Sequence, residues 1–393
     1  MAQFDKLDRL LDQFVEEGLP GCAMQIVKNG ETIYEKYAGY ADLENKKPVT
    51  RDSLFRQASL SKIPLYTAAM KLYELGKYNL TDPVSDYLPE WKDLKKFHRK
   101  PNGEMEIVPV ERPMRIEDIL SMKCGLPYCN SMEYTEDPTL KSMQEIMKPL
   151  WAKGHFTVQE HIAAMSKATL AYDPGTHWTY GFSSEITAAL LEVVYGKDID
   201  TTIQELIFDP LEMDTTRSHF FGDAQERMVK LYAWNDDGTV SETHIPLDDK
   251  HLPGEEHMAG WPRYFSNVND YSKLFGMLAN GGVYKGRQII GRKTIDLMRA
   301  NGLQGVQLED FQSDAYPYNA GYGYGYGVRT LIDKAGGNHN GSLGAFGWTG
   351  GFGTWGEADS EEGVAIVYMH NTLPDKELYY HHRMRTVAYG CLD

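Results

Sequence analysis

Segments with strand character lie at both ends of this 393-residue chain, and helical patterns fill its middle. Residues 21–39 alternate between apolar and polar side chains around Asn29-Gly30, a pair that favours a tight hairpin turn. Strand-like residues return only in 322–331, 344–355 and 363–370. Because strands need partners, these distant segments predict one sheet built from both termini, with a helical lobe inserted between them.

The order of these patterns also predicts the fold class. Hairpin signals outnumber βαβ units, so we expect an antiparallel sheet flanked by helices, an α/β fold of the α+β type. The expected division is an α/β sheet domain formed by residues 1–75 and 235–393, and a mostly helical domain formed by residues 76–234. A crevice between the two lobes is the expected place for a small-molecule site.

Two helices of the sheet domain are predicted from local signals. Asn267 and Asp270 are spaced as in a capping box, which predicts a helix from about residue 267 to 279. A last helix is expected from about 375 to 389, and His381 and His382 would lie on different faces of it.

Charge and cysteine content exclude several classes of function. A net charge of −16 leaves no basic stripe for nucleic acid or an anionic membrane. No apolar run is long enough to span a bilayer, and the N-terminus lacks a secretion signal, so we expect a cytoplasmic protein. The cysteine spacing matches no disulfide framework, zinc ribbon or redox pair, so no metal or cofactor is expected. The four cysteines are Cys22, Cys124, Cys129 and Cys391.

A serine with a lysine three positions later begins an apolar helix. Ser59 and Lys62 precede a run of apolar residues, and Pro64 fits only in a first helical turn. Residues at this spacing share a helix face, so the lysine amine would lie beside the serine hydroxyl. A buried amine tends to stay uncharged and could take the serine proton, while the helix N-terminus favours an oxyanion. The alternative is a capping serine with Lys62 pointing outward.

Three further segments accompany this motif. They are Asp173-Pro-Gly-Thr-His-Trp-Thr-Tyr180, the stretch 119–126 (ILSMKCGL), and Gly347-Trp-Thr-Gly-Gly351. Together with Ser59-x-x-Lys62, they resemble the serine β-lactamase and penicillin-binding-protein superfamily. The similarity is closest to class C β-lactamases, D-stereospecific peptidases and family VIII carboxylesterases. It runs from about residue 15 to the C-terminus, with the motifs in the family order.

The resemblance implies a role for each motif. Ser59 would be the acylated nucleophile, and Lys62 with Tyr180 would relay its proton. The backbone amides of Ser59 and Gly351 would form an oxyanion hole. Trp348, Thr349 and Gly350 would line the site on an edge strand. The alternative for Tyr180 is an ordinary core tyrosine.

Departures from the family pattern concern the substrate. Phe182 stands where the pattern has asparagine, and Trp348 replaces a lysine that attracts a substrate carboxylate. An aromatic wall fits a neutral acyl group or ester better than a free carboxylate. Tyr128, Trp261 and Arg263 are further candidates for lining the pocket, with ordinary packing or surface roles as the alternative.

The sequence therefore predicts a serine hydrolase that cleaves a small-molecule ester or amide through an acyl-enzyme on Ser59, without a cofactor. A β-lactamase, a D-stereospecific peptidase or amidase, and an acyltransferase are alternatives with the same chemistry. A non-catalytic, penicillin-binding-like sensor is the alternative from a different class.

Overall fold

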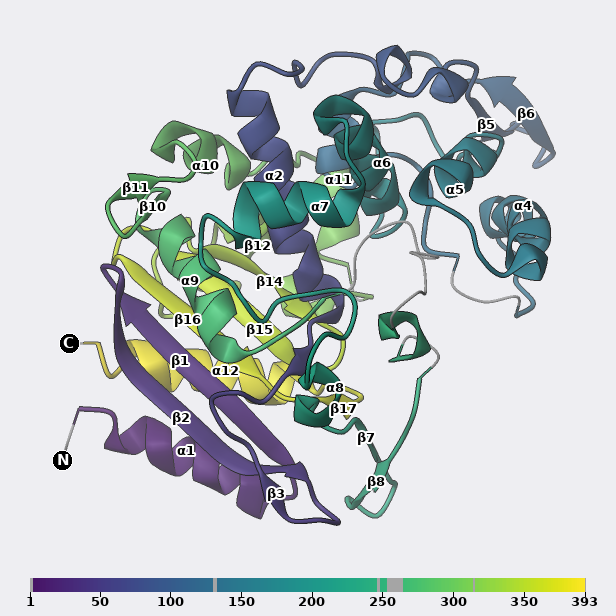
Figure 1. Cartoon of the computed structure of the whole chain (residues 1–393). Coiled ribbons are helices and arrows are strands. Elements are labelled where there is room, and N and C mark those ends of the chain that lie inside the picture. The colour runs from purple at the N-terminus through teal and green to yellow at the C-terminus, as the bar shows by residue number, and fades with distance from the viewer. Residues whose placement is uncertain (1–2, 130–132, 246–247, 253–263, 314, 393) are drawn as a thin grey trace.

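The computed structural model describes residues 3–129, 133–245, 248–252, 264–313 and 315–392. Its centre is an eight-stranded antiparallel sheet of order β12-β13-β14-β15-β16-β1-β2-β3 (Figure 1). This order confirms the predicted sheet from both termini. The strands are β1 (Gly21–Lys28), β2 (Glu31–Asp42), β3 (Lys47–Pro48), β12 (Tyr322–Tyr324), β13 (Arg329–Leu331), β14 (Phe346–Gly350), β15 (Thr354–Asp359) and β16 (Val364–Met369).

The two ends of the chain meet between β1 and β16, where Ala23 pairs with Met369 and Ile26 pairs with Ile366. The β1–β2 hairpin turns at Asn29 and Gly30, whose φ angles are 50° and 83°. Asparagine and glycine tolerate positive φ well, and this explains why the pair marks the turn correctly in the sequence.

Helices cover both faces of the sheet, as Figure 1 shows. Met24 on β1 belongs to the apolar cluster shared with α1 (Asp5–Glu16) and α12 (Glu377–Tyr389). Its neighbour Ala23 belongs instead to the cluster that contains α9 (Val268–Ala279) and the helical lobe. Alternate residues of a strand point to opposite faces, so the sheet separates two cores.

The helical lobe packs around α2, which contacts α6 and α7. Its principal helices are α2 (Lys62–Glu74), α3 (Ile116–Leu120), α4 (Pro138–Lys153), α5 (Val158–Met165), α6 (Ser183–Tyr195) and α7 (Ile199–Ile203). The remaining helices and strands are short: β4 (Phe55–Arg56), β5 (Lys95–Arg99), β6 (Met105–Pro109), α8 (Ala224–Arg227), β7 (Tyr232–Trp234), β8 (Val240–Glu242), β9 (Phe265–Ser266), β10 (Val283–Tyr284), β11 (Arg287–Gln288), α10 (Arg292–Met298), α11 (Val306–Phe311) and β17 (Thr372–Leu373).

Two predicted strands are hairpins in the structure. The segment 322–331 divides into β12 and β13, and the segment 344–355 contains β14 and the start of β15. Glycines with positive φ, Gly327 and Gly353, lie in the two connections. Such backbone angles interrupt an extended strand, and glycine adopts them without a steric cost.

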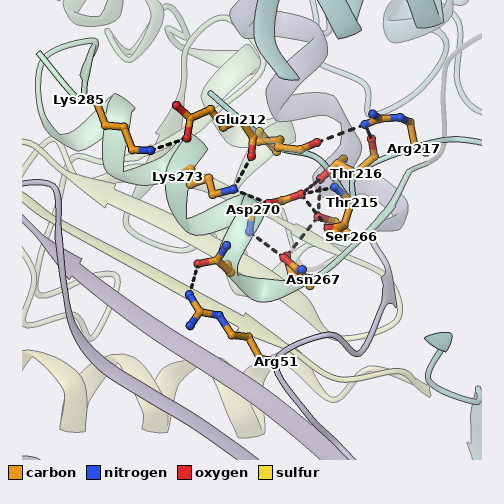
Figure 2. Close-up of polar contacts among 12 residues, drawn as sticks. Arg51, Glu212, Thr215, Thr216, Arg217, Ser266, Asn267, Asp270, Lys273 and Lys285 are labelled. Carbon is orange, nitrogen blue, oxygen red and sulfur yellow. Dashed lines mark hydrogen bonds and ion pairs between the residues drawn. The ribbon is translucent and has the colours of Figure 1, made fainter. Parts of the chain in front are cut away.

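Asp270 at the start of α9 joins this helix to the helical lobe (Figure 2). Asn267 caps the helix as predicted, because its side chain accepts a hydrogen bond from the Asp270 amide at 2.8 Å. The capping box is only half formed, since the Asp270 carboxylate turns away. It accepts hydrogen bonds from the amide and hydroxyl of Thr215, at 2.9 and 2.7 Å, and from Lys273 at 2.9 Å.

In the part of the chain that the structure describes, no helix is both long and apolar enough to cross a membrane.

The division into a sheet domain of residues 1–75 with 235–393 and a helical domain of residues 76–234 stays a prediction. The cytoplasmic location also stays a prediction.

Candidate active site

The backbone before α2 is strained at the residue that precedes Ser59. Ala58 has a φ of 46°, in the left-handed region that residues with a Cβ rarely adopt. The neighbouring Gln57 is fixed on both sides, because its N–H donates to the carbonyl of Tyr264 at 2.9 Å and its carbonyl accepts from the Thr354 hydroxyl at 3.0 Å. A short 3₁₀ turn (Ala58–Ser61) then leads into α2.

Ser59 and Lys62 lie side by side at this helix start. Lys62 Nζ is 3.3 Å from Ser59 Oγ, and the lysine side chain is buried. The same nitrogen faces two aromatic rings, at 5.0 Å from the ring centre of Tyr180 and 5.4 Å from that of Tyr128. The spacing of the two residues in the sequence therefore predicts their proximity correctly, and the outward-pointing alternative for Lys62 is wrong.

Tyr180 reaches the same place from the loop before α6. Its hydroxyl oxygen accepts a hydrogen bond from Nε1–H of Trp348 at 3.2 Å. Burial raises the pKa of Tyr180 to about 12, while hydrogen bonds with Ser59 and Trp348 act in the opposite direction. The phenol is therefore protonated at neutral pH, and it can donate a proton but does not begin as a base.

The turn between β14 and β15 is pressed against the backbone before Ser59. A Cβ on Gly350 would lie 2.2 Å from the Gln57 carbonyl oxygen, so this position requires glycine. A Cβ on Gly351 would meet no atom within 4 Å, and this residue is exposed at the tip of the turn. Thr349 donates to the Thr354 carbonyl at 3.2 Å, which closes the end of the hairpin.

The remaining predicted residues fall in different surroundings. Tyr128 makes an edge-to-face contact with Tyr180 at 5.4 Å, and its hydroxyl lies 3.5 Å from Ser184 Oγ. Phe182 is buried and contacts the ring of His161 edge to face. Trp261 and Arg263 lie outside the described residues.

Two aromatic residues complete the surroundings of Tyr180 without having been predicted for the site. Trp178 stacks on Tyr180, with ring centres 6.2 Å apart, and Tyr324 packs edge to face on Trp348 at 5.4 Å. Trp178 belongs to the same sequence motif as Tyr180, and this shared motif could have indicated that Trp178 lies near the site. Tyr324 lies in the Gly-Tyr repeat of residues 321–327, where nothing distinguishes it from its neighbours. The strained Ala58 has no sequence signal.

This arrangement can move protons between a hydroxyl, an amine and a phenol without a metal. Among the described residues, no group of three or more His, Cys, Asp or Glu side chains could hold a metal ion. The cluster brings together Ser59, Lys62, Tyr180 and Trp348, which come from three separate segments of the sequence.

Comparisons with known proteins identify the family of this chain. A model of the Beta-lactamase family matches residues 7–388. The chain belongs to the β-lactamase family. An uncharacterized protein of Mycobacterium tuberculosis is 25% identical over 364 residues, which cover 91% of this chain and 87% of that protein. Esterase EstB of Burkholderia gladioli is 26% identical over 214 residues, which cover 53% of this chain and 50% of the esterase.

Solved structures share the whole fold. The structure of EstCE1, described as a hydrolase with promiscuous acyltransferase activity, has a TM-score of 0.81 and 22% sequence identity. The match covers 99% of this chain and 98% of EstCE1. The expected fold, a sheet from both termini with an inserted helical lobe, is therefore that of the family.

Proposed function

We propose that this protein is a serine hydrolase that cleaves small-molecule esters through an acyl-enzyme on Ser59. The observation that carries the proposal is the distance of 3.3 Å between Lys62 Nζ and Ser59 Oγ at a strained helix start. The Tyr180 phenol, which contacts the same amine through its ring, supplies a second group for proton transfer. The similarity to esterase EstB supports an ester as the substrate.

In the acylation step, Ser59 Oγ forms a bond to the ester carbonyl carbon, and its proton passes to the uncharged amine of Lys62. The amides of Ser59 and Gly351 would stabilise the negative charge on the carbonyl oxygen. When the bond to the alcohol oxygen breaks, that oxygen takes the proton of Tyr180, and Lys62 returns a proton to the phenol. Tyr180 suits this order because its pKa of about 12 keeps it protonated beforehand.

In the deacylation step, water attacks the acyl carbon and gives its proton to the Lys62–Tyr180 pair. The bond to Ser59 Oγ breaks, the serine regains a proton, and a carboxylic acid leaves. The balance is one ester and one water consumed, and one acid and one alcohol formed. If an alcohol or amine attacks instead of water, the same intermediate gives acyl transfer, which is the acyltransferase alternative.

The aromatic side chains favour a neutral acyl group. Trp348 occupies the place of a lysine that would attract a carboxylate, and its N–H is directed to Tyr180. Phe182 offers no amide in place of the family asparagine. β-Lactam and D-alanyl peptide substrates, which carry a free carboxylate, are therefore the less favoured alternatives.

The decisive experiment combines ester hydrolysis with active-site labelling. We expect hydrolysis of p-nitrophenyl butyrate and a mass increase on Ser59 after treatment with a fluorophosphonate. Ser59→Ala should abolish both while the protein stays folded, because this side chain lies half-exposed at the helix start. Hydrolysis or labelling that persists in this variant would overturn the assignment.

Ser61→Ala is the matched control. The buried Ser61 Oγ accepts a hydrogen bond from the Tyr264 amide at 3.0 Å, so its loss should lower stability but leave labelling of Ser59 intact. Parallel assays with a D-alanyl dipeptide, nitrocefin and an added alcohol distinguish peptidase, β-lactamase and acyltransferase. A permanent adduct without turnover would instead indicate a sensor.

A further inference from the structure

Three buried side chains form a row beneath the candidate site. Arg329 lies on β13, and Glu377 and His381 lie one turn apart on α12. Arg329 donates to Glu377 Oε1 at 2.7 Å, and the same oxygen lies 3.8 Å from His381 Nδ1. All three residues are at most 5% exposed. Burying an ion pair gives little net stability, so stabilising the fold does not by itself explain why these three residues are buried together.

The histidine end of the row touches the turn that carries Gly351. His381 Nε2 lies 3.3 Å from the carbonyl oxygen of Gly353, and a proton on this nitrogen makes it the donor. Gly353 in turn donates to the Gly350 carbonyl at 2.8 Å. A Cβ on Gly353 would lie 1.9 Å from His370 Nε2, so the turn rests directly on buried histidines.

The arginine end of the row lies beneath the wall of the site. The Arg329 guanidinium carbon is 5.8 Å from the ring centre of Trp348, whose N–H donates to Tyr180. Arg329 also donates to the backbone carbonyl of Tyr318 at 3.4 Å.

Glu377 remains ionised between the two ends. Burial alone would raise the pKa of this carboxyl, but the charge of Arg329 and a hydrogen bond with His381 hold it at about 2. Its carboxylate therefore attracts both neighbours and keeps their positions linked.

We propose that Arg329, Glu377 and His381 are positioning residues for the reaction at Ser59. His381 fixes the turn that presents the Gly351 amide to the oxyanion, and Arg329 supports the Trp348 ring that forms one wall of the acyl site. This inference rests on the proposed function. According to this proposal, residues on the face of the sheet opposite Ser59 help to shape the site.

The histidine end is tested by comparing His381→Gln with His381→Asn. Glutamine can place an amide N–H near the position of Nε2, whereas the shorter asparagine cannot, and both are polar substitutions. We expect kcat for p-nitrophenyl butyrate to fall about 10- to 100-fold in His381→Asn, by analogy with the loss of an oxyanion donor, and to stay within about threefold in His381→Gln. KM should change little in either variant. His382→Asn, on the half-exposed face of the same helix, is the matched control and should behave as the parent protein.

A thionoester substrate separates positioning from general damage. Sulfur accepts hydrogen bonds poorly, so a thionoester gains little from an oxyanion hole. If His381 acts through the turn, His381→Asn should reduce the ratio of oxoester to thionoester turnover. Equal losses for both substrates, or a loss that glutamine does not restore, would overturn the proposal for His381.

The arginine end should affect a different parameter. Arg329→Lys keeps the charge opposite Glu377 but loses the planar group beneath Trp348. We expect a KM increase of about threefold or more with kcat nearly unchanged, since one side of an apolar wall moves. Parent-like KM in Arg329→Lys would refute the arginine half.

The failure of this inference is distinguishable from failure of the proposed function. If the parent protein hydrolyses no ester, or Ser59→Ala remains active, the proposed function fails. If Ser59→Ala is inactive and the His381 and Arg329 variants match the parent, only the positioning role fails.

Discussion

Asp270 with Thr215 and Lys273 forms one polar cluster, and Ser59 with Lys62 and Tyr180 forms another. The two clusters differ in how tightly their members are held. Asp270 is 2% exposed, and short hydrogen bonds from Thr215 and Lys273 reach both of its oxygens (Figure 2). Ser59 and Lys62 are 3.3 Å apart, and the amine faces aromatic rings.

The difference separates a structural from a reactive arrangement. A carboxylate surrounded by donors is stabilised in one protonation state and is costly to disturb. A hydroxyl beside an amine and a phenol, next to a backbone strained at Ala58, can exchange protons with little rearrangement. Changes at Asp270 should therefore affect stability, and changes at Ser59 or Lys62 should affect rate.

The largest effect is expected from Lys62→Met, which keeps the length of the side chain but removes the amine. Ester hydrolysis should fall on the order of 10³-fold, because the serine loses its proton acceptor. Steady-state kinetics with p-nitrophenyl butyrate, together with a thermal melt, provide the measurement. An active Lys62→Met protein would contradict the distinction between a reactive Ser59 group and a structural Asp270 group, because the amine would then be structural.

Asp270→Ala should give the converse result. The donors of Thr215 and Lys273 would lose their acceptor, at a cost of about 3 kcal/mol in the free energy of unfolding. The rate per folded molecule should stay at the parent value, since Asp270 does not contact the Ser59 group. Chemical denaturation measures the first quantity and active-site titration the second. Asp270→Asn, which keeps one acceptor oxygen, should cost less.

A third buried group, His161, provides a pH test of stability. Burial between aromatic rings lowers its pKa from 6.5 to about 4, so the folded protein binds fewer protons than the unfolded chain between these values. The free energy of unfolding should therefore decrease by up to about 3 kcal/mol as the pH falls from 6.5 to 4. Unfolding curves at several pH values test this, and His161→Met should give a flatter profile. Identical profiles would contradict the assignment.

The smallest effect is expected from Trp348→Phe. Loss of the N–H removes a hydrogen bond that lowers the pKa of Tyr180, so this pKa should rise further. A weaker proton donor slows departure of the alcohol, and kcat should fall about tenfold for poor leaving groups, which corresponds to one hydrogen bond. Activated esters should be less affected. A comparison of ethyl and p-nitrophenyl esters measures the difference, and equal losses would indicate that Trp348 acts only by packing.

Local patterns in the sequence predicted the elements that short-range physics controls. Asn29-Gly30 marks the hairpin turn, Asn267 caps α9, and Ser59 lies next to Lys62 because three residues complete nearly one helical turn. The sequence did not predict the division of 322–331 and 344–355 into hairpins, since strand propensity continues across glycines whose backbone angles depend on packing.

The sequence by itself determined the sheet from both termini, a helix start close to Ser59 and, through a family resemblance, the candidates Tyr180 and Trp348. Only the tertiary structure decided that Asp270 turns to Thr215 rather than back to Asn267, that Ala58 is strained, and that His381 meets the carbonyl of Gly353. The physical reason is the range of the forces. Turns and helix caps depend on neighbouring residues, whereas a buried polar group takes whichever partner the folded chain brings within hydrogen-bonding distance.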